Sequence, residues 1–243
     1  MTATPRVYEP FVVGLDLGQA QDPTALAVLE RSPGVAPADP VFHRVRHLHR
    51  WPLWTSYPVI VSDVRDLLDR PPLKGAVTAL VVDATGVGAA VVDLFEDAGL
   101  GVRLVPVTIT AGAEAHEVDL GWRVPKRDLV GISQVLLQRR RLRIAKALPE
   151  AARLLEEMEQ FRVEITERGR DTYAAAAGAH DDLVLAVALA CWFGELVSPA
   201  QIDAPEEDRE WTWAEMMRLK YEETHRSRPH RRPAQPNFED GVN

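Results

Sequence analysis

The chain has 243 residues, of which 46% are hydrophobic, and its formal net charge is −8. This length and apolar content suffice for one substantial core, whereas the acidic balance argues against a free-standing, high-affinity DNA-binding module. The single cysteine, Cys191, excludes a disulfide framework and a thiolate zinc site. Residues 1–10 show no leader pattern and the longest apolar stretch, Leu183–Phe193, is too short to span a bilayer. We therefore expect a cytoplasmic protein without membrane contact.

The first half of the chain predicts three strands in succession, followed by alternating helices and strands. Apolar runs of period two or of continuous type predict the strands, and apolar spacing of three and four predicts the helices. In chain order, the predicted elements are strands at 11–17, 24–30 and 41–50, a helix at 57–68, a strand at 78–83, a helix at 88–98 and a strand at 102–107. This order predicts an α/β fold with a mixed sheet, in which three antiparallel strands precede parallel strands and helices flank the sheet.

The second half of the chain is predicted to be mainly helical. Residues 108–122 are polar and contain glycine, so we expect a loop there. In chain order, the next predicted elements are a helix at 125–140, a strand at 142–144, a helix at 148–160, strands at 162–166 and 172–175, and a final core helix at 180–197. The composition then changes, which predicts a domain over 1–198 and a charged tail over 199–243, disordered apart from a helix at 209–225.

Four aspartates lie at positions where hydrophobic packing does not explain a carboxylate. Asp16 and Asp83 each end an apolar strand, and Asp181 and Asp182 open the apolar final helix. If the two strands are adjacent and parallel, these carboxylates meet at one edge of the sheet, and clustered carboxylate oxygens are the ligands of Mg²⁺ or Mn²⁺. Each aspartate also has an ordinary explanation, as a turn residue or a helix cap. Which of Asp181 and Asp182 binds metal stays open.

Three segments carry these aspartates in a recognisable order. They are Gly14–Gly18 followed by Asp22–Ala25, then Val82–Gly88, then His180–Ala186, with Val124–Lys126 and Leu142–Ile144 between the last two. Over most of residues 10–195 the chain resembles the nuclease domain of phage terminase large subunits, which has a ribonuclease-H-like (resolvase-like) fold. The resemblance implies a metal-dependent endonuclease that cuts double-stranded, concatemeric phage DNA during genome packaging. It further implies two Mg²⁺ or Mn²⁺ ions held by catalytic Asp16, Asp83, Asp181 and Asp182.

The chain departs from terminase large subunits in one respect, because it contains no phosphate-loop motif of a packaging ATPase. The segment Gly86–Gly88 lacks the lysine that such a loop needs. We therefore expect that the chain does not translocate DNA by itself. Either a separate packaging ATPase partners it, or it is a standalone nuclease of terminase type. A small terminase subunit and a portal are the other partners that the resemblance implies.

Basic residues gather in two places, over His43–Arg50 and between Arg123 and Lys146. Either cluster is suited to DNA phosphates, and the alternative for both is a solvated face that offsets the acidic excess. The second cluster is favoured, with Lys126 first because it opens a helix, where the helix dipole also favours an anion. The expected DNA contacts are Lys126, Arg127, Arg139, Arg140 and Arg141.

Two further features have mainly structural explanations. His116 and His180 are expected to serve in turns or as supporting groups, since a hard-cation site requires no histidine. Trp213, Met217 and Tyr221 form a stripe in the tail, which suits either a partner protein or the chain's own core.

Two other functions compete with the nuclease. A phosphotransferase of the actin/hexokinase fold also begins with a strand, an Asp-x-Gly turn and a return strand, which Asp16–Gly18 fits, but the chain shows no second glycine-rich loop for adenosine. A non-catalytic ribonuclease-H-like assembly module would not require every acidic position to be filled. We therefore expect an endodeoxyribonuclease.

Overall fold

The computed structural model describes residues 8–18, 21–33, 40–86, 89–112, 114–167 and 180–196. Its elements are β1 (Phe11–Asp16), β2 (Ala25–Ser32), β3 (Phe42–Arg50), α1 (Tyr57–Leu68), β4 (Thr78–Asp83), α2 (Ala89–Asp97), β5 (Arg103–Thr110), β6 (His116–Val118), β7 (Gly121–Pro125), α3 (Lys126–Gln138), β8 (Leu142–Ile144), α4 (Ala151–Glu167) and α5 (Asp182–Leu196). The predicted strand at 172–175, the tail helix at 209–225 and its aromatic stripe lie outside the described residues.

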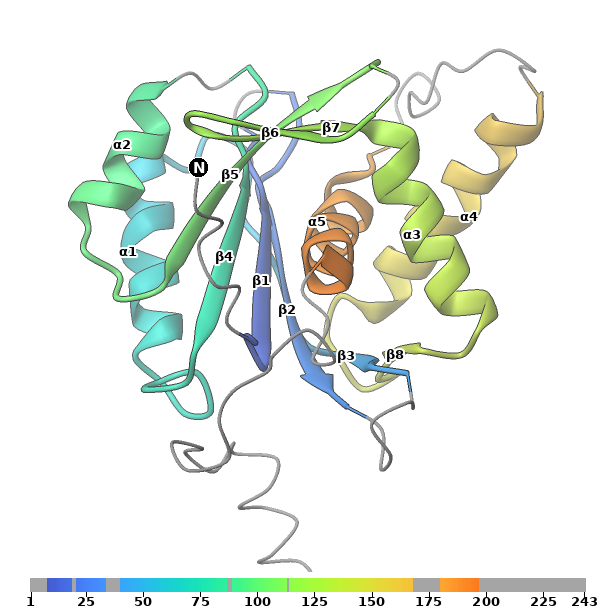
Figure 1. The fold of residues 1–243 in the computed structure, drawn as a ribbon, viewed down its shortest axis with the longest axis horizontal. Coiled ribbons are helices and arrows are strands. Elements are labelled where there is room, and N and C mark those ends of the chain that lie inside the picture. The colour runs from blue at the N-terminus through green and yellow to red at the C-terminus, as the bar shows by residue number, and fades with distance from the viewer. Residues whose placement is uncertain are drawn as a thin grey trace, which may run out of the picture. The chain divides into compact units, whose positions relative to one another are not determined.

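The strands form one sheet in the order β6-β7-β5-β4-β1-β2-β3-β8. β1 pairs antiparallel with β2 and β2 with β3, whereas β4 lies parallel to β1 and β5 lies parallel to β4. Helices α1 and α2 cover one face, and α3, α4 and α5 lie on the other (Figure 1). This arrangement confirms the predicted fold class, an α/β ribonuclease-H-like fold with three antiparallel strands followed by parallel ones.

Helix α5 is the centre of the larger core. Its residues from Asp182 to Gly194 are all buried, because the helix is apolar on every side and packs on β1 and β2. The helix approaches β1 so closely that a Cβ atom on Gly14 would lie 1.9 Å from the carbonyl oxygen of Ala186. Glycine at position 14 therefore sets how near the helix lies to the sheet.

The predicted loop over 108–122 is wrong, because the chain there extends the sheet. β5 continues to Thr110, and β6 and β7 form a hairpin whose second strand pairs parallel with β5. All three residues of β6 are exposed, so this edge strand lacks the apolar alternation that identifies a half-buried strand. Its polar composition follows from its place at the edge of the sheet.

The predicted strand over 162–166 is also wrong, since the backbone of α4 continues to Glu167. The prediction rested on the β-propensity of a short segment. Such propensity is a weak guide to secondary structure where the preceding residues already form a helix that can extend. None of the described helices is long and apolar enough to cross a membrane.

We expect Gly14→Ala to lower the free energy of unfolding by about 3 kcal/mol, because the added methyl group overlaps the α5 backbone. Urea denaturation followed by circular dichroism measures the change. Gly131→Ala on α3 is the matched control, since a Cβ there meets nothing within 4 Å. It should raise the free energy of unfolding by about 0.5–1 kcal/mol through helix propensity. Equal effects of the two substitutions would contradict the proposed contact.

Candidate metal centre

Asp16 and Asp83 lie side by side at the carboxyl edge of the sheet. They end β1 and β4, which are adjacent and parallel, with Leu15 paired to Val82. Asp83 is 7% exposed and Asp16 is partly buried. The two carboxyl groups are close enough for each to shift the pKa of the other. Both aspartates thus stand where the strand order predicted them.

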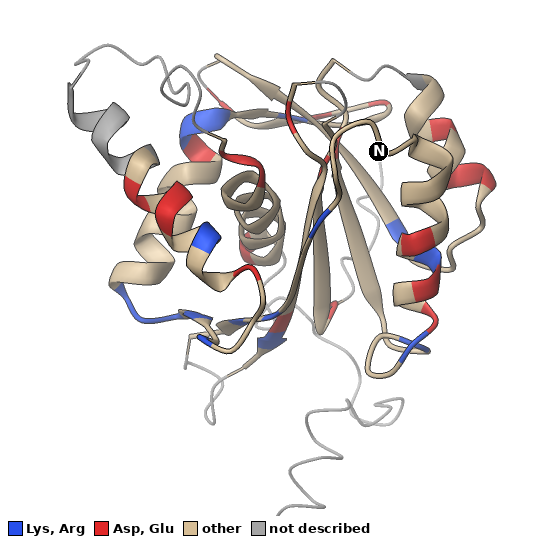
Figure 2. Cartoon of the chain, turned by 180° about the vertical axis from the view of Figure 1, so that it is seen from behind, with Lys and Arg blue, Asp and Glu red and all other residues tan. Residues whose placement is uncertain are grey.

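The start of α5 brings two more carboxylates to this edge. Asp182 is the first residue of the helix and Asp181 precedes it. The charges of both act on Asp16, together with that of Asp83. Figure 2 shows the acidic start of α5 beside the basic start of α3. The structure therefore gathers all four predicted carboxylates from β1, β4 and α5.

The crowding has a clear electrostatic consequence. Burial, followed by the charges of Asp83, Asp181 and Asp182, raises the pKa of Asp16 well above its usual value. Burial also raises the pKa of Asp83, but the backbone N–H of Thr85 donates to Asp83 Oδ1 at 2.7 Å and favours the charged form. Burial and the neighbouring carboxylates therefore favour the neutral form of Asp16, whereas Asp83 keeps a contact that favours its charged form.

Two cations distinguish Asp181 from Asp182. The guanidinium of Arg50 binds Asp182 through two hydrogen bonds, of 2.5 and 3.0 Å, and the Asp182 side chain is only 2% exposed. Lys126 Nζ lies 2.7 Å from one oxygen of Asp181, whose side chain is 20% exposed. Asp182 is therefore a buried, bidentate partner, while Asp181 makes a single ion pair close to solvent.

Glu157, on α4, supports the start of α5 and was not predicted from the sequence. Its Oε2 accepts the backbone N–H groups of Leu183 and Val184 at 3.0 and 3.2 Å. Burial and the nearby charge of Asp182 raise the pKa of Glu157 to about 8. These contacts correct the helix-cap explanation of the two aspartates, because Glu157 takes the N–H groups that a capping aspartate would take.

The donor set fits a hard divalent cation in its chemistry, since it consists of carboxylate oxygens whose mutual repulsion helps to raise the pKa of Asp16. Within the described residues, no three His, Cys, Asp or Glu side chains are already arranged as ligands of one ion. Two of the four carboxylates are paired with cations in this structure, Asp181 with Lys126 and Asp182 with Arg50.

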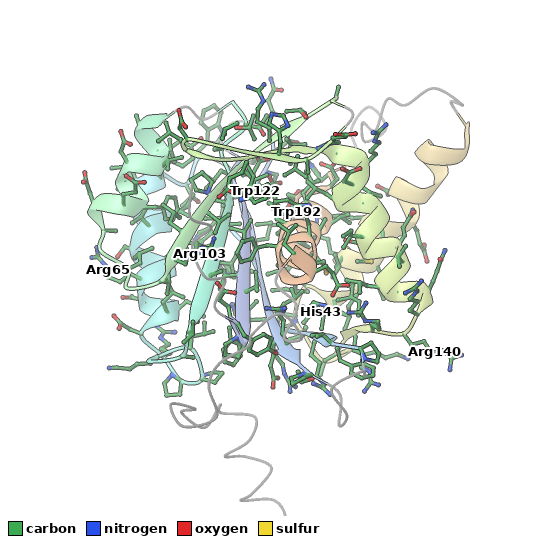
Figure 3. The ribbon with its side chains drawn as sticks, in the orientation of Figure 1. His43, Arg65, Arg103, Trp122, Arg140 and Trp192 are labelled. Atoms are coloured by element: carbon green, nitrogen blue, oxygen red, sulfur yellow. The ribbon has the colours of Figure 1, made fainter. Side chains whose placement is uncertain are left out.

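The predicted DNA-contact residues separate into two groups. Lys126 and Arg127 open α3 beside the carboxylates, and Arg127 lies 3.5 Å from Asp128. Arg139 and Arg140 follow the other end of α3, roughly 20 Å away along a helix of this length. Arg140 extends away from the ribbon in Figure 3. The structure therefore does not bring the arginines at 139–141 to the carboxylates.

Arg141 belongs to a separate network at the far end of α5. Its guanidinium binds both oxygens of Glu195, at 2.9 and 2.7 Å, and the carbonyl of Val41. His43 Nε2 also binds Glu195, at 2.8 Å. In the first basic cluster, Arg46 pairs with Glu30 and Arg50 with Asp182, whereas Arg44 binds the hydroxyl of Ser32.

The histidines do not join the carboxylates. His116 is exposed on β6, with Nδ1 3.3 Å from the carbonyl of Glu114. His180 Nδ1 lies 3.4 Å from Asp22 in an exposed pair. A turn or supporting role for His116 and His180 stays a prediction.

The sequence matches no family model and no curated protein. Among solved structures, the chain is similar to the manganese-soaked terminase nuclease domain of human cytomegalovirus, at 13% identity over 78% of this chain and 86% of that one, with a TM-score of 0.46. It is similar to the manganese-bound large terminase nuclease domain of bacteriophage SPP1, at 11% identity over 75% and 85%, with a TM-score of 0.45. RuvC of Thermus thermophilus is similar at 15% identity over 75% and 91%, with a TM-score of 0.35.

We expect Asp16→Asn to become more stable relative to the wild type, in the metal-free protein, as the pH rises above the usual range of an aspartate. The folded-state pKa of Asp16 is raised, so the stability that its proton contributes is present below its usual pKa and is lost as the pH rises through the folded value. Asparagine does not titrate, so the variant lacks this pH dependence of stability. The difference in the free energy of unfolding between the variant and the wild type should shrink towards about pH 4. Urea denaturation in EDTA at several pH values tests this, with Asp97→Asn as an exposed control. A pH-independent difference would contradict it.

We expect Asp182→Asn to lower the free energy of unfolding of the metal-free protein by about 3 kcal/mol, because Arg50 then loses its buried carboxylate. Asp181→Asn should change it by less than about 1 kcal/mol, because its pair with Lys126 is partly solvated. Urea denaturation of both variants in EDTA provides the comparison. Equal losses would show that the two ion pairs do not differ as described.

Proposed function

We propose that this protein is a Mg²⁺- or Mn²⁺-dependent endodeoxyribonuclease of the terminase nuclease type, which cuts double-stranded phage DNA during genome packaging. The observation that supports it most is the convergence of four carboxylates at one sheet edge, where burial and mutual repulsion raise the pKa of Asp16. Such a cluster is costly for folding alone, and perturbed carboxylates are typical of functional sites. The support for the proposed function therefore rests on residues of this chain.

The proposal gives the four aspartates different tasks. Asp16, Asp83 and Asp181 would hold the divalent ions, and these ions would supply an activated water molecule and charge stabilisation for the leaving oxygen of the phosphodiester. Asp182, held by Arg50, fixes the start of α5 and thereby places Asp181. Glu157 fixes the same helix start through two backbone N–H groups. Thr85 orients Asp83 through its backbone N–H.

DNA is proposed to approach along the edge where α3 and α5 begin. Lys126 and Arg127 stand there, at a helix N-terminus that favours an anion. Arg139, Arg140 and Arg141 are not favoured as contacts with the same stretch of DNA, because the first two follow the opposite end of α3 and the third binds Glu195. A separate packaging ATPase, a small terminase subunit and a portal remain the proposed protein partners.

We expect the purified protein to nick or linearise supercoiled plasmid DNA in the presence of Mn²⁺. Asp16→Ala and Asp83→Ala should lower the rate about a hundredfold or more, since loss of a metal ligand costs at least as much as loss of the groups that support it. Agarose gel electrophoresis over time measures the conversion.

The exposed variant Asp97→Asn is the control for this assay and should keep the wild-type rate. Wild-type activity in Asp16→Ala would overturn the assignment. ATP hydrolysis without any DNA cleavage would favour the phosphotransferase instead.

A further inference from the structure

Lys126 is the cation closest to solvent among those paired with the site's carboxylates. It begins α3 directly after β7, the strand that runs parallel to β5, so it stands at the same edge as Asp83. Its Nζ lies 2.7 Å from Asp181 Oδ2, and the two side chains are 22% and 20% exposed. Its charge also lowers the pKa of Asp83. Lys126 thus offsets part of the negative charge of the cluster.

We propose that Lys126 is a displaceable counter-ion, which occupies Asp181 in the metal-free protein and must leave that carboxylate before a divalent cation binds there. The inference rests on the proposed function, because it takes Asp181 as a metal ligand. An ammonium at hydrogen-bonding distance blocks one carboxylate oxygen and repels a second cation at the same place. Lys126 therefore competes with Mg²⁺ or Mn²⁺ and lowers the affinity of the site.

The contrast with Arg50 explains why Lys126 is the group that yields. Arg50 holds Asp182 with two hydrogen bonds and is 15% exposed, so its release would leave a buried charge on each side. Lys126 makes one contact with Asp181, through a compact and strongly hydrated ammonium on a flexible stem. Water can hydrate that ammonium group when it separates from Asp181. Of the two ion pairs, the one at Lys126 is cheaper to open.

The same pair accounts for the arrangement of the carboxylates in this structure. With Asp181 turned to Lys126, the described acidic side chains do not surround a common point. Release of Lys126 would free Asp181 to turn towards Asp16 and Asp83, whose charges already act together. The competition therefore predicts that the metal site is completed by a local side-chain change at the start of α3.

The test is the affinity for Mn²⁺, measured by isothermal titration calorimetry without DNA. Lys126→Met keeps the alkyl stem and removes the charge, and it should bind Mn²⁺ about three- to tenfold more tightly than the wild type. Lys126→Arg keeps the charge and should bind Mn²⁺ no more tightly than the wild type. Lys126→Gln provides a second neutral variant should Lys126→Met fail to fold.

Arg123→Met is the matched control, because it removes one exposed positive charge from the preceding strand β7. It should change the affinity by less than about twofold, since a solvated charge is largely screened. Thermal unfolding in EDTA checks that each variant is folded.

The possible results separate this inference from the proposed function. Unchanged affinity in Lys126→Met, together with loss of binding in Asp83→Asn, would overturn the role of Lys126 and leave the metal site standing. Equal tightening in Lys126→Met and Arg123→Met would also overturn it, because the effect would then be one of general charge. The absence of Mn²⁺ binding in the wild type and in all variants would overturn the inference and the proposed metal site together.

Discussion

The close contact between α5 and β1 is the constraint on which the rest of the structure depends. Gly14 allows the Ala186 carbonyl to approach the strand to a distance that excludes any Cβ. Because α5 is apolar on all sides, it is buried along its length and cannot shift towards solvent. The helix therefore begins at the edge where β1 and β4 end. The packing thereby brings Asp181 and Asp182 close enough to the strand ends for their charges to raise the pKa of Asp16.

Ion pairs hold α5 at both ends. At its start, Arg50 binds Asp182 and Glu157 accepts two backbone N–H groups. At its end, burial raises the pKa of Glu195, but the hydrogen bonds from His43 and Arg141 outweigh it and hold this pKa at about 2. These end contacts supply directional interactions that an apolar helix lacks along its sides. They fix the rotation and the position along its axis at which α5 presents Asp181.

The carboxylate cluster is balanced in three ways that differ in strength. Burial and the neighbouring carboxylates favour the neutral form of Asp16, a buried guanidinium binds Asp182, and a partly solvated ammonium binds Asp181. Of the two ion pairs, the one between Arg50 and Asp182 is the more costly to open, because it would leave buried charges. Arg50 and Asp182 are therefore better suited to hold the start of α5 in place than Lys126 and Asp181.

The sequence by itself determined the fold class and the four aspartates. Two local patterns identify these aspartates: an apolar run that ends in one carboxylate, and an Asp pair before an apolar helix. Both patterns can be recognised without knowing which residues lie nearby in the fold. The hairpin β6–β7 was not predicted, because an exposed edge strand carries no apolar alternation. The end of α4 was not predicted, because local β-propensity is a weak guide to secondary structure. Only the tertiary structure decided that Arg50 takes Asp182, that Lys126 takes Asp181, and that Glu157 caps the helix. Each of these contacts joins residues far apart in the chain, and their meeting depends on how α3, α4 and β3 pack around α5 rather than on any local pattern.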